Sequence, residues 1–205
     1  MLFRSVTNGS LVHWSDMLAV RPEARGTGLG EELKRYQREK VRPLGVEVML
    51  WTADPLVARN AHFNINHLGA VPAEYVENMY GGNTGSVLHG AMPTDRFVYR
   101  WHLDRPAPAT RSGMDASGDA AIPAAIAFEP DGTPVATSAV YATQVRIHLP
   151  HDLSQVQSTS AAEALAWRIA VRAAFLSLLG RGFVVTRFVR GRDDALPYYV
   201  LSAES

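Results

Sequence analysis

The chain has 205 residues, of which 47% are hydrophobic and 20% are charged, and this balance is typical of a globular protein with a sizeable core. Twenty Lys and Arg residues match twenty Asp and Glu residues, so the formal net charge is zero and general nucleic-acid binding is not expected. The lack of cysteine excludes disulfides, thiolate nucleophiles and cysteine-based zinc sites. Because the sequence shows neither a signal-peptide pattern nor an apolar run of membrane-spanning length, we expect a soluble, cytoplasmic protein without a membrane partner.

The first half of the chain alternates short apolar runs with helical patterns. In chain order these patterns predict a strand, a helix, a strand, a helix and two strands, over residues 11–20, 31–41, 46–52, 56–68, 75–80 and 97–103. The helix predicted at 31–41 is marked by a spacing of three and four residues at Leu33, Tyr36, Gln37 and Lys40. Because helices connect the strands, this half is predicted to be an α/β unit.

A segment of different composition precedes the second half. Residues 106–121 are rich in Pro, Ala, Ser, Gly and Asp, which is typical of a linker. Beyond it the patterns predict a hairpin, a strand, a long helix and two paired strands, over residues 125–138, 144–149, 160–179, 183–189 and 198–202. We see no internal repeat. The chain is therefore divided into a core at 1–105, a linker at 106–121 and a small C-terminal α+β extension at 122–205.

The long helix predicted at 160–179 has a clear start and one marked stripe. Ser160 and Glu163 form the capping-box pattern that begins a helix. The stripe consists of Leu165, Ile169, Arg172 and Leu176. The helix is broadly apolar, so we expect it to be buried against the strands that follow. Arg168 and Arg172 share one face, where they are expected to reach either an anionic ligand or solvent.

A glycine-rich turn separates the first predicted strand from the first predicted helix. Its sequence is Arg25-Gly26-Thr27-Gly28-Leu29-Gly30. Glycine turns tightly and leaves backbone N–H groups unobstructed, and such groups at a helix start form an anion site that the helix dipole strengthens. The guanidinium of Arg25 suits phosphate oxygens. The turn therefore predicts a phosphate-binding cradle.

Other interpretations of this turn fit less well. A Walker A loop ends in Gly-Lys-Ser or Gly-Lys-Thr, and these residues are missing. A dinucleotide-binding fingerprint has the spacing GxGxxG, whereas the glycines here follow GxGxG. The alternative that stays open is a glycine-rich connection that binds no ligand.

With Val20-Arg21-Pro22-Glu23-Ala24 in front of it, the turn resembles the coenzyme A motif of the GNAT superfamily of N-acetyltransferases, Arg/Gln-x-x-Gly-x-Gly/Ala. The stretch from Trp51 to Ala70 is similar to the next segment of that family that contacts coenzyme A, and Pro93-Thr94-Asp95-Arg96 resembles an uncharacterised acetyltransferase-like subgroup. The resemblance covers residues 10–103. It implies a GNAT-like acyl-CoA N-acyltransferase fold with a shortened N-terminal part, and acetyl-CoA as cosubstrate.

The resemblance also implies roles for residues at matching positions. The end of the first strand would face the pantetheine arm with the backbone groups of Met17, Leu18, Ala19 and Val20. The pyrophosphate would be held by Arg25, Gly26, Thr27, Gly28, Leu29 and Gly30. Asn60 would hydrogen-bond the pantetheine or another part of coenzyme A.

Two departures from the family pattern bear on the chemistry. Many members carry a tyrosine in the second helix that protonates the leaving thiolate, and the matching position here is Ile65, which has no proton to give. The family also has two strands and two helices before the motif strand, whereas only residues 1–10 precede it here. We therefore expect the acceptor-binding wall to be reduced, replaced by the C-terminal extension or supplied by a partner chain.

Acyl transfer to an amine needs a base whose pKa lies near neutrality. The catalytic candidates are His13 and Asp16, which the alternation of the motif strand places on opposite faces. His62 and His67 are predicted on the second helix, five residues apart, a spacing that does not put both on one helical face. Asp95 is a candidate for binding a cationic acceptor. For each of these residues an ordinary surface or core-edge role is the alternative, and no metal-ligand pattern is present.

Three functional hypotheses follow. The leading one is an N-acetyltransferase without a metal, in which an amine of a small molecule or a protein N-terminus attacks the thioester of acetyl-CoA directly. Orientation and oxyanion stabilisation would supply most of its rate. The second is a non-catalytic acyl-CoA-binding or scaffold protein with a degenerate acceptor site, which Ile65 and the short N-terminal part favour. The third is a structural domain without a ligand. The reduced front half makes a homodimer attractive.

Overall fold

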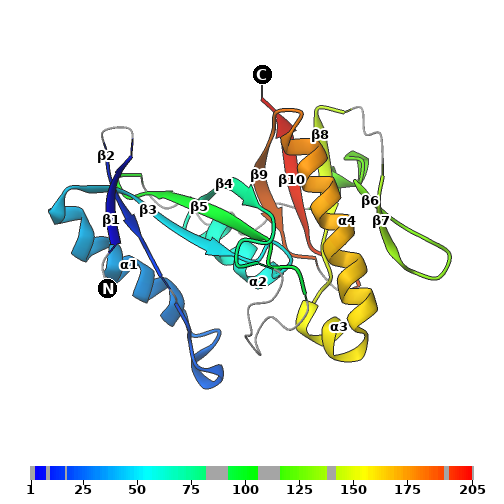
Figure 1. The fold of residues 1–205 in the computed structure, drawn as a ribbon, viewed down its shortest axis with the longest axis horizontal. Helices are drawn as coiled ribbons and strands as arrows, with labels where there is room; N and C mark the ends of the chain where they lie inside the picture. The colour runs from blue at the N-terminus through cyan, green and yellow to red at the C-terminus, as the bar shows by residue number, and fades with distance from the viewer. Residues whose placement is uncertain are drawn as a thin grey trace.

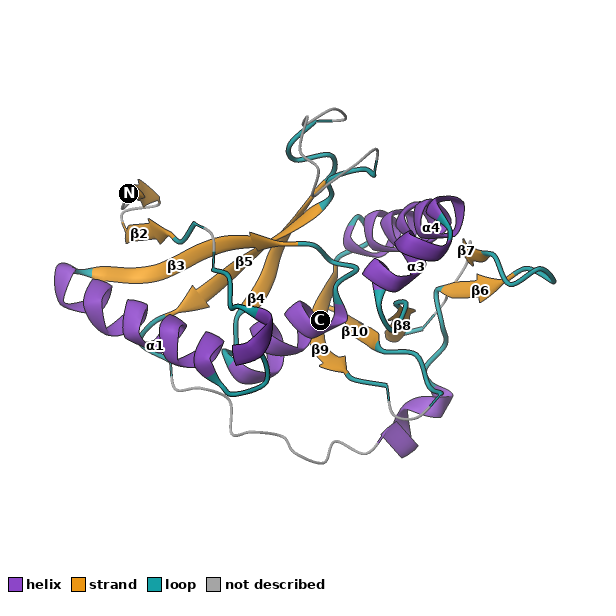
Figure 2. Ribbon diagram, turned by 90° about the horizontal axis from the view of Figure 1, so that it is seen from below, coloured by secondary structure: helices purple, strands orange, loops and turns teal. Residues whose placement is uncertain are grey.

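The computed structural model describes residues 3–7, 10–16, 18–81, 92–105, 116–137, 142–191 and 194–204. Its first half is a five-stranded sheet with α1 (Leu29–Val41) along one face (Figures 1 and 2). The strand order is β1-β2-β3-β5-β4, with bounds Phe3–Thr7, Ser10–Trp14, Val46–Ala53, Arg96–His102 and Val71–Val76 in that order. Strands β2 and β3 are parallel, whereas the other neighbours are antiparallel. The short helical pieces are η1 Pro22–Ala24, η2 Arg42–Leu44, α2 Ala58–Ala61 and the π-helix η3 His62–His67.

The second half contains a three-stranded antiparallel sheet and two helices. The sheet order is β8-β10-β9, with bounds Gln144–His148, Tyr198–Ala203 and Phe183–Val189. Helices α3 (Leu153–Thr159) and α4 (Ala161–Leu179) connect β8 to β9. The hairpin of β6 (Ile126–Phe128) and β7 (Pro134–Ala136) packs against α4, as Figure 1 shows.

The two halves share a connectivity that the sequence did not reveal. In the first half, β3 is followed by α2 and η3 and then by the hairpin β4–β5, with β5 inserted between β3 and β4. In the second half, β8 is followed by α3 and α4 and then by β9–β10, with β10 inserted between β8 and β9. Each half is thus a strand–helix–strand–strand unit in which the last strand lies in the middle. The two units therefore share a topology although their sequences show no repeat.

One hydrophobic cluster joins the two units. It includes Phe97 of β5 together with Phe175 of α4 and Tyr199 of β10, whose ring centroids lie 4.8 to 5.8 Å apart. Edge-to-face contacts of this kind add to the stabilisation that burial of the rings provides. The α+β class is confirmed. The division at 1–105 and 122–205 stays a prediction, and the core crosses it.

Several element predictions need correction. The strand expected over 11–20 is paired only to Trp14, and the strand expected over 75–80 is replaced by β4, which ends at Val76. Pro72 is accommodated in β4 because this strand lies at the sheet edge and its register shifts beside that residue. The helix expected over 56–68 begins at Ala58, and most of it is π-helical. Strand β1 and helix α3 were not predicted. The other strands, the hairpin and the two long helices are confirmed.

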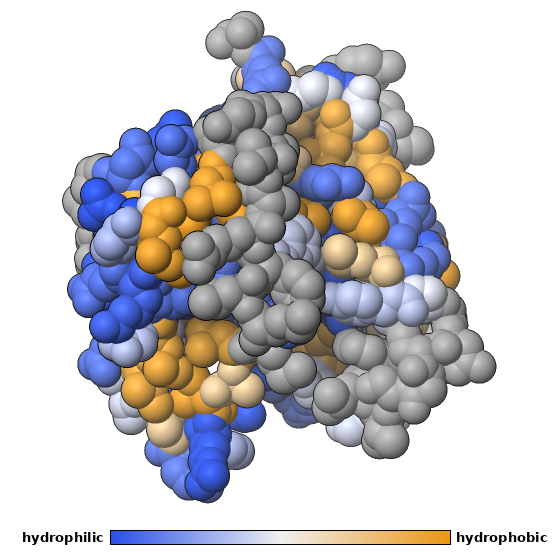
Figure 3. Space-filling view, turned by 60° about the vertical axis from the view of Figure 1, so that its left-hand side comes forward, coloured by the Kyte–Doolittle hydropathy of each residue, from blue (hydrophilic) through white to orange (hydrophobic). Residues whose placement is uncertain are grey.

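The buried sides of α1 and α4 are not those expected. Leu33 and Tyr36 are 39% and 57% exposed, whereas Lys34 and Val41 of α1 are buried. On α4 the predicted stripe is exposed at Leu165, Ile169 and Leu176, because the sheet side is occupied by Trp167, Arg168, Val171 and Phe175. The face drawn in Figure 3 accordingly shows apolar patches among polar residues. Ser160 caps α4 as predicted, by accepting from the N–H of Glu163 at 3.1 Å.

Part of the predicted linker is structured. Residues Ala116–Ala121 form the 3-10 helix η4, while residues 106–115 lie outside the described part of the chain. Asp119 is 5% exposed and accepts from both terminal nitrogens of Arg187 and from the hydroxyl of Tyr198. This ion pair fixes η4 to the three-stranded sheet.

Candidate functional site

The glycine-rich turn lies at the start of α1, as the sequence predicts. Gly26 and Gly28 have φ angles of +80° and +87°, in the left-handed region that favours glycine. A Cβ built on either would meet no atom within 4 Å, so the space around them is open. The carbonyl of Gly28, the N-cap, accepts from the N–H groups of Glu31 and Glu32. The N–H groups before Glu31 have no partner within the helix, which is the backbone arrangement of an anion site.

The other residues of the turn hold its shape. The exposed Arg25 donates from Nε to the carbonyl of Val20 at 3.3 Å, which keeps its guanidinium beside the turn. Thr27 donates from Oγ1 to the carbonyl of Ala24 at 2.8 Å. Leu29 is exposed, and a Cβ on Gly30 would lie 3.7 Å from Val20 and 3.9 Å from Phe63. Gly30 therefore packs near Val20 and Phe63 at distances where a Cβ would also fit.

Strands β2 and β3 diverge where the motif strand was expected to continue. The N–H of Ser15 donates to the carbonyl of Leu50 at 2.7 Å, after which the chain leaves strand pairing while β3 continues to Ala53. The residues predicted to face the pantetheine arm follow this point: Leu18 and Ala19 are exposed, Val20 is half-buried, and Met17 lies outside the described residues. Beyond Leu50, β3 is therefore not paired with β2 in the described residues.

The two catalytic candidates lie on opposite sides of the sheet, as alternation requires. Asp16 is exposed, whereas His13 is 1% exposed beneath α1. Asn60, the third residue of α2, is half-buried. The structure therefore brings Asp16 and the pantetheine-facing residues together at the surface, and it separates them from His13.

A buried chain of polar side chains connects His13 to the divergence of the strands. Lys34 donates from Nζ to Ser15 Oγ at 2.8 Å, and Ser15 donates to Gln37 Oε1 at 2.9 Å. Gln37 Nε2 in turn lies 3.0 Å from His13 Nε2. These hydrogen bonds run in one direction, because Lys34 donates to Ser15 and Ser15 donates to Gln37. Ser15 is shared between this chain and the last hydrogen bond to β3.

Lys34 is an unusual residue to find in this position. It is 2% exposed, and its Nζ lies 4.0 Å from the centre of the Trp51 ring. A buried ammonium is normally matched by a carboxylate. Within the described residues its hydrogen-bond partner is instead the neutral Ser15 hydroxyl. Burial consequently lowers the pKa of Lys34 to about 8, so a substantial fraction of the amine is neutral close to physiological pH.

A second polar chain runs from η3 to the first turn of α1. Asn66 Nδ2 donates to the carbonyl of Phe188 at 2.9 Å, which fixes its amide, and lies 2.8 Å from His62 Nδ1. His62 therefore accepts at Nδ1 and donates from Nε2 to His67 Nε2, 3.1 Å away. His67 donates from Nδ1 to Glu31 at 3.2 Å.

This chain corrects the argument from histidine spacing. Residues five apart lie on different faces of an α-helix, but η3 is a π-helix, whose i→i+5 hydrogen bonds align them. The rings of His62 and His67 accordingly meet edge to face at 4.8 Å. Burial, with electrostatic contributions from His67 and Arg190, lowers the pKa of His62 to about 4. Burial favours a higher pKa for Glu31, but hydrogen bonds from Arg35 and His67 outweigh it and keep the pKa low.

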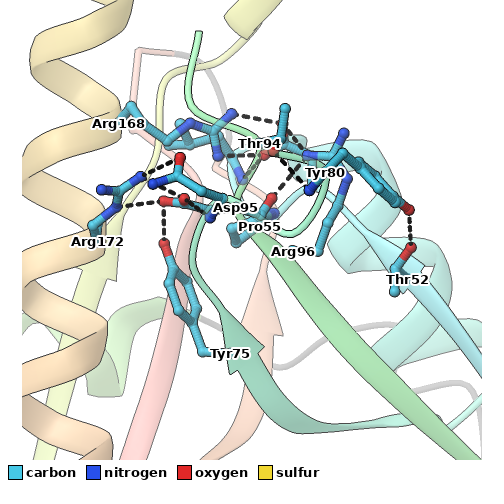
Figure 4. A network of polar contacts seen from close by, with 12 residues as sticks. Thr52, Pro55, Tyr75, Tyr80, Thr94, Asp95, Arg96, Arg168 and Arg172 are labelled. Carbon is cyan, nitrogen blue, oxygen red and sulfur yellow. Dashed lines mark hydrogen bonds and ion pairs between the residues drawn. The ribbon is translucent and has the colours of Figure 1, made fainter. Parts of the chain in front are cut away.

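Two arginines of α4 hold two carboxylates of the first unit (Figure 4). Arg168 is 2% exposed and donates to both oxygens of Asp54 at 2.8 and 2.6 Å. Arg172 donates to both oxygens of the fully buried Asp95. The prediction that Asp95 binds a cationic acceptor is therefore wrong, because the buried carboxylate is bound by Arg172. Arg168 is buried against Asp54, whereas Arg172 remains partly exposed.

A small polar pocket lies beside the first of these ion pairs. Its walls come from the end of β3, the chain before β5 and the helices α3 and α4, and comprise Asp54, Met92, Pro93, Arg96, Leu153, Gln157 and Arg168. Asp54 also accepts from Arg96 at 3.4 Å. The pocket therefore contains two guanidinium groups around one carboxylate at the boundary of the two units.

Within the described ranges no group of three or more histidine, aspartate or glutamate side chains is arranged to hold a metal ion. None of the helices in the described part of the chain is both long and apolar enough to cross a membrane. Comparison with protein-family models, with curated proteins and with solved structures gave no match.

Proposed function

We propose that the chain binds an acyl-CoA at the glycine-rich turn and transfers the acyl group to an amine, as an N-acetyltransferase does. The observation that carries the proposal is the turn itself. Gly26 and Gly28 adopt positive φ angles in open space, and their N–H groups precede the first helical hydrogen bonds of α1. An anion bound there gains both hydrogen bonds and the field of the helix dipole.

The neighbouring geometry supports a ligand longer than a phosphate. The chain runs from the divergence of β2 and β3 at Ser15 through exposed residues to the turn. A pantetheine arm laid along residues 18–20 would lead from the cradle to that divergence, with the thioester at its inner end. Asp16 is exposed beside this route and is the surface base that remains for direct attack by an amine.

A second candidate function is an acyl-CoA-binding protein without transferase activity. Two observations favour it: Ile65 packs against the hydrophobic core, where it offers no proton to a leaving thiolate, and Asp95 is used internally by Arg172. The two functions share the coenzyme A site, and they differ in whether an acceptor amine is bound and acylated. The acceptor, a small amine or a protein N-terminus, and a homodimer remain predictions.

Isothermal titration calorimetry with acetyl-CoA and with free CoA tests the coenzyme A binding that both functions require. We expect binding that is weakened at least tenfold by Arg25→Glu, because the substitution places a negative charge beside the pyrophosphate. The matched control is Arg42→Glu, which makes the same charge change at the other end of α1 and should leave affinity within about twofold. Absence of binding by the unmodified chain overturns both functions. If binding is seen, thiol release with a panel of amines distinguishes the enzyme from the binder.

A further inference from the structure

We infer that Ser15 and Lys34 form a second reactive centre, at which Ser15 accepts the acyl group of an acyl-CoA thioester when no amine is bound. This inference rests on the proposed acyl-CoA binding and adds a thioester-cleaving activity to it. Ser15 Oγ is the nucleophile, and Lys34 Nζ, 2.8 Å away, is its base. A serine hydroxyl becomes an effective nucleophile when a positioned base takes its proton, and serine–lysine pairs are one known solution.

The position of Ser15 favours this role. Its N–H makes the hydrogen bond to Leu50 after which β2 and β3 diverge, and its side chain is 5% exposed, so a thioester has to enter between the two strand ends to reach it. The thioester of a coenzyme held at Gly26–Gly30 would reach the same place along residues 18–20. The next backbone N–H, that of Asp16, would donate to the developing oxyanion in this inference.

The surroundings of Lys34 make it a base rather than a fixed cation. The Trp51 ring and the sheet exclude water from it, and the polar contact that the described residues give its Nζ is to Ser15. The charged residues one turn away on α1, Glu31 and Arg38, are bound instead to Arg35 and His67 and to the carbonyl of Leu103. Once Lys34 is neutral, its lone pair can accept the Ser15 proton, which the hydroxyl now directs to Gln37 Oε1.

The steps balance in atoms and protons. Ser15 Oγ attacks the thioester carbonyl carbon, and its proton moves to Lys34 Nζ. The C–S bond breaks as the Oγ–C bond is established, and the coenzyme A thiolate takes the proton from the Lys34 ammonium. Water, or an amine that arrives later, then attacks the serine ester and gives a proton to Lys34, which passes it to Oγ as the Oγ–C bond breaks. Lys34 thus supplies the acid that Ile65 does not.

The test uses the full chain and acetyl-CoA without an amine. Free thiol should appear in a burst close to one equivalent, followed by slow turnover, and the intact protein should gain one acetyl group. Peptide mapping should place this group on Ser15, and hydroxylamine should remove it, because esters are cleaved under conditions that leave amides intact. An acetyl group on Lys34 that resists hydroxylamine would overturn the assignment.

Variants separate the reactive centre from the binding site. Ser15→Ala should abolish acetylation, and Lys34→Arg, which keeps a cation but no usable base, should slow the burst at least about a hundredfold. Both should retain CoA affinity, and Ser158→Ala on the exposed face of α3 should behave as the unmodified chain. If CoA binds to the unmodified chain but neither a burst nor acetylation is seen, this inference fails and the proposed function stands. If CoA does not bind, both fail.

Discussion

Asp95 and Arg172, 77 residues apart in the chain, form an ion pair in which Nε and Nη2 of the guanidinium donate to the two carboxylate oxygens at 2.8 and 2.5 Å. The Tyr75 hydroxyl and the Asn78 N–H complete the coordination of the carboxylate. Burial alone would raise the pKa of Asp95, but these donors outweigh it and hold the pKa below its usual value. The pair therefore joins α4 to the residue that precedes β5, and breaking it would leave a buried charge without a partner.

Removal of Arg172 should be strongly destabilising. In Arg172→Met the Asp95 carboxylate stays buried without a counter-charge, and we expect a loss of about 3–5 kcal/mol in the free energy of unfolding, measured by urea denaturation. Adding Asp95→Asn to this variant should restore part of the loss, because the uncompensated charge is gone. The exposed pair of Arg35 and Glu31 provides the control: Arg35→Gln should cost less than about 0.5 kcal/mol. Equal losses in the two single variants would contradict the assignment.

The cradle can be probed at a single glycine. Gly28→Ala forces a side chain into a φ of +87°, which should cost about 1–2 kcal/mol of stability, and its Cβ would occupy the open side of the turn, so CoA affinity should also fall. Gly45→Ala is the matched control, because Gly45 has a φ of +83°, equally open surroundings and a position at the far end of α1. Calorimetry should show lower affinity in the first variant only.

The buried amine predicts an unusual pH dependence. The pKa of Lys34 is about 8 in the folded chain and 10.5 in an exposed lysine, so between these values the unfolded state binds more protons and stability should rise with pH. Below pH 8 the full cost of burying the charge applies, about 3 kcal/mol for a pKa difference of this size. Lys34→Met should therefore raise the free energy of unfolding at pH 7 and flatten its rise between pH 8 and 10. The exposed Lys40→Met should do neither.

Acid should weaken the junction between η3 and α1. Because the pKa of His62 is lowered to about 4 from 6.5, the unfolded state binds more protons in this interval, and stability should fall as pH drops through it. In His62→Gln the loss between pH 6.5 and 4 should be smaller, as thermal unfolding at several pH values can show. His151→Gln, at an exposed histidine, should leave the slope unchanged. An identical slope in all three proteins would exclude His62 as a cause.

Most of the secondary structure and the glycine-rich turn could be predicted from patterns that are local in the sequence. The apolar run of β3, the Ser160 cap and the glycine turn were predictable because each depends on residues close together in the sequence. The charged pairs were not, since Asp54 and Arg168 are 114 residues apart. Lys34 was missed because a lysine in a charged stretch, Glu31-Glu32-Leu33-Lys34-Arg35, looks like a surface residue. The aligned histidines were missed because the sequence did not distinguish a π-helix from an α-helix.

Contacts between the two strand–helix–strand–strand units make the stability of each unit depend on the other. Arg168 and Arg172 reach from α4 into the first unit, and Asn66 reaches from η3 to the backbone of β9. Each unit therefore covers aromatic surface that the other would expose if it were alone. A chain cut between residues 105 and 116 should remain associated, and the two pieces produced separately should each aggregate yet assemble when they are refolded as a mixture.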